Sequence, residues 1–189
     1  GSTDIGLDAE GRALVRTWRV PPELDDFDWL SSPMQRALET ARILSGGEPA
    51  TDARLSEMCW GAWEGRTIPE LRAELGNLMR AWEARGLDFC GPGGESPRDV
   101  QDRLGPLLRE IAQSGRPVVA VTHRGVIRAV YALATGWDMA CKRAEAKALA
   151  RIIPAEDLPA PTDYIEGVYV DITELDVTPP TPALPAPGC

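Results

Sequence analysis

The chain has 189 residues, of which 43% are hydrophobic and 26% charged, so it is long enough to bury the core of a single globular domain. Its net charge of −9 argues against nucleic acid as a partner, because phosphate backbones bind basic surfaces. The four cysteines are widely spaced and form no metal-ligand pattern. The sequence shows neither a signal peptide nor an apolar stretch long enough for a membrane span, which predicts a cytoplasmic protein that does not bind membranes.

The first strand and helix expected at a functional site come early in the chain. Residues 27–30 are predicted to form a strand, followed by Ser31-Ser32 as a helix cap and by Pro33 as the first helical residue. The helix is expected to continue to residue 44, with its apolar side chains facing the sheet. Arg36 lies off this apolar stripe in the first turn, close to where an anion would dock, although a lone arginine is more often a solvated surface residue.

Two further amphipathic helices are predicted in the middle of the chain. Apolar residues at helical spacing predict one helix over residues 71–82 and another through residues 100–111. Ser96 should cap the second helix, with Pro97 at its first position. The intervening residues 91–95 lack the Lys-Ser/Thr ending of a phosphate-binding glycine loop, so they are predicted to be a linker.

His123 is the only histidine in the chain, and it follows a short run of apolar, mostly β-branched residues. Such a run predicts a buried strand of a parallel sheet, and a buried helix is expected to begin at Gly125. In open α/β sheets, ligands bind at the carboxyl ends of the strands, where helix N-termini offer N–H groups to anions. A phosphate is the expected ligand. The alternative is a histidine that only packs or caps at the strand end.

The composition changes in the last quarter of the chain. All 20 lysines and arginines lie at or before Arg151, whereas seven acidic residues and eight of the 17 prolines follow it. We therefore expect a core domain over residues 1–139 and a divergent segment over residues 140–177. Within that segment, residues 143–151 could form a helix and residues 168–173 a last strand. A disordered, proline-rich tail is expected over residues 178–189.

Four motifs occur in order along the chain. They are Ser-Ser-Pro-Met-Gln-Arg-Ala-Leu-Glu-Thr-Ala at residues 31–41, Leu-Ser-Glu-Met-Cys-Trp-Gly-Ala-Trp-Glu-Gly at residues 55–65, Gly-Gly-Glu-Ser at residues 93–96 and Val-Thr-His-Arg-Gly at residues 121–125. Together they resemble the histidine phosphatase (phosphoglycerate mutase-like) superfamily, over about residues 1–139. This resemblance implies a three-layer α/β/α sandwich with a mostly parallel central sheet, and phosphoryl transfer through a phosphohistidine.

The resemblance also implies roles for individual residues. His123 corresponds to the second histidine of the family, which stabilises the transferring phosphoryl group, and Arg36 to a phosphate-clamping arginine. Glu57 corresponds to the proton donor, and its apolar neighbours would favour the protonated carboxyl group that this role needs. Thr3 and Arg124 are expected, with Arg36, to contact the substrate. The expected partner is a small phosphorylated metabolite, with no metal or cofactor, and the protein is expected to be a monomer or homodimer.

Three further residues of the second motif are expected to be structural. Glu64 is expected to be a turn residue or the partner of a helix cap. Trp60 and Trp63 could stack on a substrate, but aromatic side chains of this kind more often pack in the core.

The family's nucleophilic histidine lies in an Arg-His-Gly motif at the end of a first strand, which would immediately precede Gly1. We expect that strand to lie between the strands ending at Leu30 and Thr122, so that its absence would expose two sheet edges. The chain is thus interpreted as part of a longer, active protein, and as unable by itself to form the phosphoenzyme. The alternative is a pseudophosphatase that binds a phosphorylated ligand without turnover.

The spacing of the motifs favours a phosphatase over a phosphoglycerate mutase. Only a short helical segment separates Gly65 from Gly93, whereas the mutases carry a longer insertion there. They also usually have Tyr-Gly-x-Leu where this chain has Gly-Ala-Trp at residues 61–63. The predicted activity of the intact protein is therefore that of a histidine acid phosphatase-type phosphoric monoester hydrolase, with a phosphoglycerate mutase as an alternative.

Overall fold

The computed structural model describes residues 1–140, which contain a parallel sheet of three strands in the order β2-β1-β3. In register, Asp28 pairs with Val118 and Ser31 with Val121. The strands are β1 (Asp28–Ser31), β2 (Ala50–Thr51) and β3 (Val118–Val121). The α-helices are α1 (Ala9–Thr17), α2 (Gln35–Ser45), α3 (Ile68–Leu75), α4 (Asn77–Glu83), α5 (Pro97–Ser114) and α6 (Arg124–Thr135), and the 3-10 turns are η1 (Pro22–Leu24), η2 (Ala53–Leu55), η3 (Gly61–Trp63) and η4 (Gly86–Asp88).

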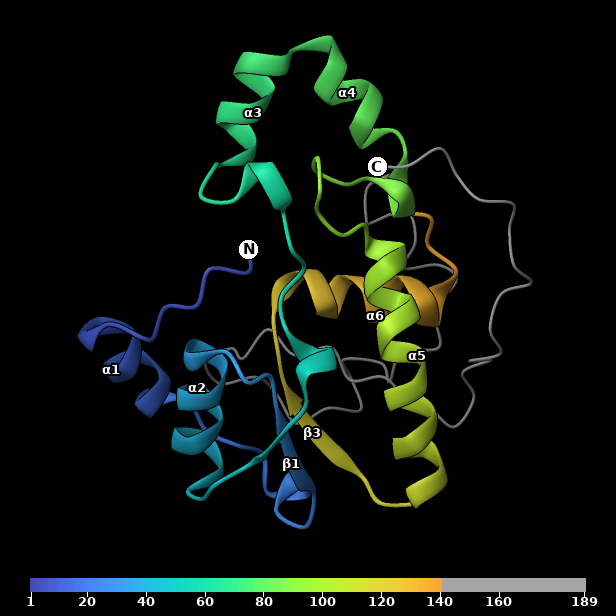
Figure 1. Ribbon diagram of the computed structural model, residues 1–189. Helices are drawn as coiled ribbons and strands as arrows, with labels where there is room; N and C mark the ends of the chain where they lie inside the picture. Colours follow the sequence, from blue (N-terminus) through green and yellow to red (C-terminus); the bar gives the residue numbers. More distant parts are fainter. Residues whose placement is uncertain (141–189) are drawn as a thin grey trace.

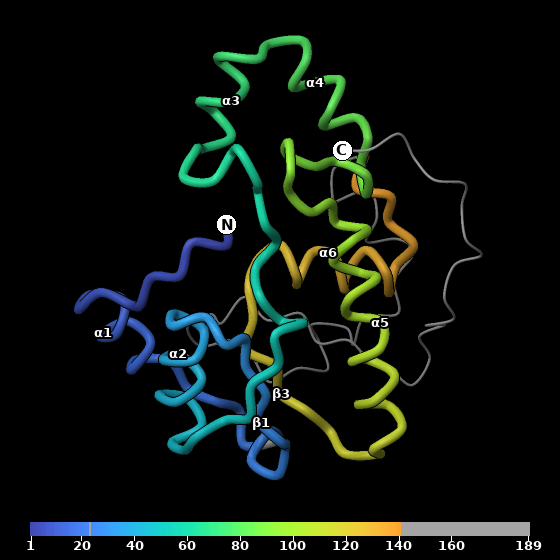
Figure 2. The backbone as a smooth tube through the Cα atoms, viewed as in Figure 1, coloured from blue at the N-terminus to red at the C-terminus, as the bar shows by residue number. Residues whose placement is uncertain are grey.

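Helices cover both faces of the sheet, which gives the expected three-layer α/β/α arrangement (Figure 1). Helix α2 packs on β1 and β3, and α1 packs on α2. Helices α5 and α6 pack against each other on the opposite side. The chain leaves the sheet after β2 and rises into the α3–α4 pair, which lies beyond one end of the strands (Figure 2).

The direct pairing of β1 with β3 corrects one expectation. A first strand was expected between these two, but their hydrogen-bonded ladder continues from Asp28 N–H on Pro117 O to Ser32 N–H on Val121 O. Within residues 1–140, β3 is an edge strand, and its side that faces away from β1 has no strand paired to it. A further strand would therefore pair beside β3 and not between β3 and β1.

Two helix predictions also need correction. Helix α2 begins at Gln35 with Met34 at the N-cap, and neither serine of the predicted cap closes it; the Asp4 side chain accepts the Gln35 N–H instead. The single helix predicted over residues 71–82 is two helices, because Gly76 adopts a positive φ of 51° and ends α3. By contrast, Ser96 caps α5 as predicted, in a capping box with Asp99.

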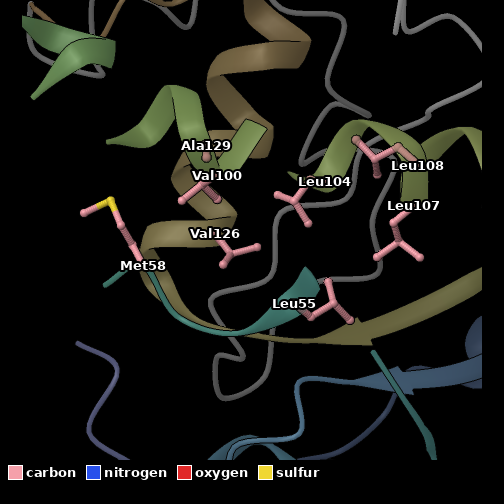
Figure 3. Close-up of a cluster of buried hydrophobic side chains, with 8 residues drawn as sticks. All are labelled: Leu55, Met58, Val100, Leu104, Leu107, Leu108, Val126 and Ala129. Atoms are coloured by element: carbon pink, nitrogen blue, oxygen red, sulfur yellow. The ribbon is translucent and has the colours of Figure 1, made fainter. Parts of the chain in front are cut away.

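The main core cluster lies where α5 and α6 meet the segment that follows β2 (Figure 3). Partly buried Leu30 of β1 packs against it, so the cluster joins the helices to the sheet. Its buried members are Leu55, Met58, Val100, Leu104, Leu107, Leu108, Val126 and Ala129. Two of these, Leu55 and Met58, flank the Glu57 segment, so that segment is anchored in the core on both sides.

A second hydrophobic cluster supports the α3–α4 pair and involves the tryptophans of the second motif. Trp63 is buried with Leu71 and Met79, and its ring centroid lies 4.7 Å from that of Trp82. Trp60 packs against both clusters. The two tryptophans of the second motif therefore pack in the structure, as the sequence predicts. The helix and strand predicted over residues 143–151 and 168–173, and the proline-rich tail, lie outside the described residues.

Candidate active site

His123 lies at the carboxyl end of β3 and at the N-cap position of α6. Its side chain is buried, with 6% of the residue exposed, and its Nε2 lies 2.8 Å from the hydroxyl of Ser32. Ser32 directly follows β1, so the histidine contacts the end of the neighbouring strand. The only histidine of the chain is thus at the edge of the sheet where ligands of open α/β folds bind.

The surroundings of His123 keep its imidazole neutral at pH 7. Burial lowers its pKa from 6.5 to about 4, since the charged form loses solvation, and the positive charge of Arg36 adds to this effect. Arg103 acts in the same direction, whereas Asp4 opposes it. A neutral imidazole has one N–H donor and one acceptor nitrogen, so His123 can donate a hydrogen bond to an oxygen without carrying charge.

Arg36, in the first turn of α2, contacts the beginning of the chain. Its Nη1 donates to the carbonyl oxygen of Thr3 at 2.8 Å, and its Nη2 donates to that of Gly1 at 2.9 Å. Nη2 also lies 3.6 Å from the sulfur of Met34. The guanidinium therefore lies beside residues 1–3 and close enough to His123 to lower the pKa of that histidine. The structure brings these two sequence-predicted residues together.

The protein's own carboxylates occupy the two helix N-termini at this site. Asp4 Oδ1 accepts the N–H of Gln35 at 2.7 Å, which is where the sequence suggested free N–H groups for an anion. At the start of α6, Glu57 accepts the N–H of Gly125 at 3.1 Å. Binding of a phosphate would therefore depend on cationic side chains more than on the N–H groups of these helix ends. This corrects the expectation that the helix N-termini offer free N–H groups to the anion.

Glu57 reaches α6 because its segment and Gly125 fit closely. The same carboxylate accepts the N–H of Met58 at 2.8 Å, and the Glu57 N–H points to the sulfur of Met34 at 3.4 Å. A Cβ on Gly125 would lie 2.4 Å from Oε1 of Glu57, so a side chain there would displace the carboxylate. Glu57 is thus bound to the first turn of α6, two residues after His123, although the two segments are distant in the sequence.

Glu64 holds the first residues of the chain, a role that the sequence did not reveal. Its carboxylate accepts hydrogen bonds from Ser2 N–H at 2.8 Å, Ser2 Oγ at 3.0 Å, Thr3 Oγ1 at 3.3 Å and Trp60 N–H at 2.8 Å. Burial opposes ionisation, but these hydrogen bonds outweigh it and lower the pKa of Glu64 to about 2. Glu64 therefore has a structural role, as expected. Its partners, however, lie at the start of the chain, about sixty residues before it in the sequence, and not in a local turn or helix cap.

The two remaining predicted substrate contacts differ in their surroundings. Thr3 is exposed, but its hydroxyl donates to Glu64 and its carbonyl accepts from Arg36. Arg124, the first residue of α6, is exposed next to His123, and no ion pair joins it to any residue in the part of the chain described. Arg124 thus presents an exposed positive charge directly after His123.

A cavity of about 300 Å³ lies next to the start of α2, and none of the five predicted site residues lines it. It is lined by Ser2, Asp4, Pro33, Met34 and Ser56, which come from the start of the chain, the start of α2 and the residue before Glu57. This volume is room enough for a small organic group. Among residues 1–140, no group of three His, Cys, Asp or Glu side chains is arranged to hold a metal ion. No helix in that range combines the length and apolar character that a membrane crossing requires.

Comparison with known proteins identifies clear relatives. The chain is 40% identical over 151 residues to a glucosyl-3-phosphoglycerate phosphatase of Mycolicibacterium vanbaalenii, covering 72% of this chain and 66% of the relative. It is 34% identical over 146 residues to the enzyme of that name from Mycobacterium tuberculosis, covering 70% and 65%. The chain thus spans about two thirds of the length of these two relatives.

Solved structures agree with the sequence relatives. The mycobacterial glucosyl-3-phosphoglycerate phosphatase in complex with inorganic phosphate superposes with a TM-score of 0.64 at 30% identity, covering 74% of each chain. A phosphoglycerate mutase from Thermus thermophilus has a TM-score of 0.50 at 31% identity, covering 71% of this chain and 72% of that one. A family model matches residues 1–152. The chain belongs to the histidine phosphatase superfamily (branch 1).

Proposed function

We propose that this chain carries the phosphoryl-stabilising and proton-donating part of a phosphomonoesterase site, in an intact protein whose nucleophilic histidine immediately precedes Gly1. The observation that carries the proposal is that Arg36 binds the first residues of the chain and lies close enough to His123 to lower its pKa, while Glu57 binds the N–H of Gly125, two residues after His123. Since Gly1 O accepts from Arg36, a residue placed before Gly1 would enter the site beside that guanidinium. The N-terminus lies near the carboxyl end of β3 (Figure 1).

Two further observations support an upstream strand. His123 is the only histidine in the 189 residues, so a phosphohistidine mechanism with His123 as the stabilising residue needs a second imidazole. Within the described residues, the edge of β3 that faces away from β1 has no strand paired to it. A parallel strand added at that edge would end near His123, because parallel neighbours end on the same side of a sheet.

The proposed reaction has two steps. In the first, the nucleophilic imidazole nitrogen bonds to phosphorus as the bond from phosphorus to the substrate oxygen breaks, and Glu57 gives its proton to the leaving oxygen. In the second, the Glu57 carboxylate takes a proton from a water molecule that attacks phosphorus, and the nitrogen–phosphorus bond breaks to release inorganic phosphate. Arg36 and the N–H of neutral His123 stabilise the charge on the phosphoryl oxygens in both steps.

The substrate class follows from the cavity and from Arg124. A cavity of about 300 Å³ beside the start of α2 has room for a small phosphomonoester, and exposed Arg124 next to His123 would add an ionic contact to the phosphate. Hydrolysis is preferred to mutase activity, in agreement with relatives that are named phosphatases. The reaction proceeds without a metal ion or cofactor in this proposal, because the charge is handled by side chains.

The test compares phosphate release by the chain extended with its native upstream residues and by the 189-residue chain. His123→Ala and Arg36→Ala should each lower kcat/KM by about 100-fold or more in the extended protein. Arg42→Gln is the matched control on α2, because Arg42 pairs with exposed Glu48 away from the site and should leave kcat/KM unchanged. Equal activity of all three variants would contradict the site assignment. An extended protein that is stabilised by phosphate but releases none from any phosphomonoester would instead support a binding protein.

A further inference from the structure

The segment over residues 54–59, which carries Glu57, is held from the side of α5 by Arg103 and, at its first residue, by the ion pair of Arg54 with Glu110. Arg103 Nη2 donates to the carbonyl oxygen of Ser56 at 2.7 Å, and its Nη1 donates to that of Arg54. Both acceptors are main-chain oxygens, and Ser56 is the residue directly before Glu57. The guanidinium therefore fixes the backbone at the point where the Glu57 side chain leaves it.

Glu95 holds the same segment on the other side of Glu57. Its Oε2 accepts the N–H of Cys59 at 2.9 Å, while its own N–H donates to Cys59 O at 2.8 Å. Its Oε1 accepts from Arg103 Nε at 2.8 Å, so the two side chains form one ion pair. The pair thus joins residues 54, 56 and 59 through a single connected set of hydrogen bonds.

Burial gives this pair more weight than the ion pairs Arg54–Glu110 and Arg98–Asp88, which also join α5 to neighbouring turns; the side chain of Glu110 is 59% exposed. The side chains of Arg103 and Glu95 are 21% and 29% exposed, whereas those of Arg98 and Asp88 are 47% and 52% exposed. Exposed pairs contribute little, whereas shielded, charge-assisted hydrogen bonds constrain geometry more strongly. The charge of Arg103 also reaches the site, since it is among the cations that lower the pKa of His123.

Glu57 itself has little freedom to compensate for a shift of its backbone. Its carboxylate fits against the Gly125 N–H at 3.1 Å, in a space that a Cβ on Gly125 would fill. A displacement of the segment by about 1 Å would therefore break this contact and move the carboxyl group away from a leaving oxygen. Small misplacements of this size are known to cost enzymes much of their rate.

We propose that Arg103 and Glu95 are positioning residues for proton donation by Glu57: they hold residues 54–59 so that its carboxyl group faces the leaving oxygen of the substrate. This inference rests on the proposed function, because it assigns Glu57 the role of proton donor. It predicts a defect that depends on the substrate. An alkoxide leaving group needs a proton, whereas p-nitrophenolate leaves without one.

The experiment uses the extended protein with two substrates, p-nitrophenyl phosphate and glycerol 2-phosphate. Arg103→Lys and Glu95→Gln should lower kcat for glycerol 2-phosphate by about tenfold or more and change kcat for p-nitrophenyl phosphate by less than about threefold. Arg98→Gln is the matched control on α5 and should leave both values unchanged. Combining Arg103→Lys with Glu57→Gln should cause no further loss beyond Glu57→Gln alone, because both changes remove the same step.

The outcomes separate this inference from the proposed function. Equal losses on both substrates, or additive losses in the double variant, would overturn the positioning role. If Glu57→Gln shows no preference between the substrates, the proton-donor assignment itself is wrong, and the positioning role is wrong with it.

A second measurement needs no turnover. In the 189-residue chain, Arg103→Lys should speed amide hydrogen exchange at Gly125 by about tenfold, because Glu57 would no longer hold that N–H. Arg98→Gln should not change it, and unchanged exchange in Arg103→Lys would overturn the inference even if the protein hydrolyses no substrate.

Discussion

Acidification should destabilise the fold because His123 becomes protonated in the unfolded chain. Since the chain has one histidine, a single substitution separates this effect from the titration of other groups. The pKa of the buried imidazole is about 4, while the ordinary value of 6.5 applies once the chain unfolds. Between these values the unfolded chain binds a proton that the folded chain excludes, so stability falls as the pH is lowered. The contribution is fully present above pH 6.5, is lost progressively on acidification, and does not change further below pH 4.

The size of the effect follows from the two pKa values. Between pH 7 and pH 4.5, proton binding to the unfolded chain should lower the free energy of unfolding by about 2 kcal/mol, given 1.36 kcal/mol for each pKa unit. Other groups titrate in this range, so the comparison is with His123→Asn, which lacks the imidazole. The wild-type protein should lose about 2 kcal/mol more than this variant over the same pH interval.

Urea unfolding at closely spaced pH values measures this difference, and proton NMR of the only imidazole gives its pKa directly. Parallel curves for the two proteins between pH 7 and pH 4.5 would refute the reasoning. So would an imidazole that titrates near 6.5 in the folded protein, because His123 would then be solvated and free to carry charge.

Three other predictions concern glycines and Glu64. Gly125→Ala should lower the free energy of unfolding by about 1 kcal/mol, measured by urea titration, because the new methyl group displaces the Glu57 carboxylate from its N–H partner. Gly105→Ala should gain less than the roughly 0.5–1 kcal/mol that is usual for a glycine inside a helix, because Pro106 follows it in α5 and the proline ring crowds a Cβ on the preceding residue; a gain of about 1 kcal/mol in the same assay would contradict this. Glu64→Gln should lower the melting temperature at pH 7 and remove part of the acid sensitivity of the wild-type protein. The Glu64 carboxylate stabilises the fold fully above pH 4.5 and loses this effect as the pH falls toward its pKa of about 2; identical melting curves of the two proteins from pH 7 to pH 2.5 would contradict this assignment.

Local sequence signals predicted much of the sheet and of the helix starts. The strand predicted from the β-branched run before His123 and the helix start predicted at Ser96-Pro97 are both confirmed, because each depends on neighbouring residues. The break at Gly76 was missed, since a glycine inside an amphipathic pattern can equally remain helical, and only its positive φ shows otherwise.

The contacts that complete the site depend on pairing across long stretches of chain. Asp4 caps α2 from 31 residues away, and Arg103 reaches carbonyl groups 47 and 49 residues before it. Surface aspartates and arginines are common, so nothing local distinguishes these two from solvated residues. The strand order was also wrong in the prediction, because a parallel pair such as β1 and β3 can have its connections arranged in several ways.

The carboxylates at the starts of α2 and α6 have a consequence for the end of a catalytic cycle. With Asp4 and Glu57 already bound to these N–H groups, free phosphate would gain little from the helix dipoles and would meet the negative charge of Asp4 nearby. Its retention would depend on screened attraction to arginine side chains, which weakens as ionic strength rises. Under the proposed function, inorganic phosphate should therefore leave the site readily, and its accumulation should inhibit hydrolysis only weakly.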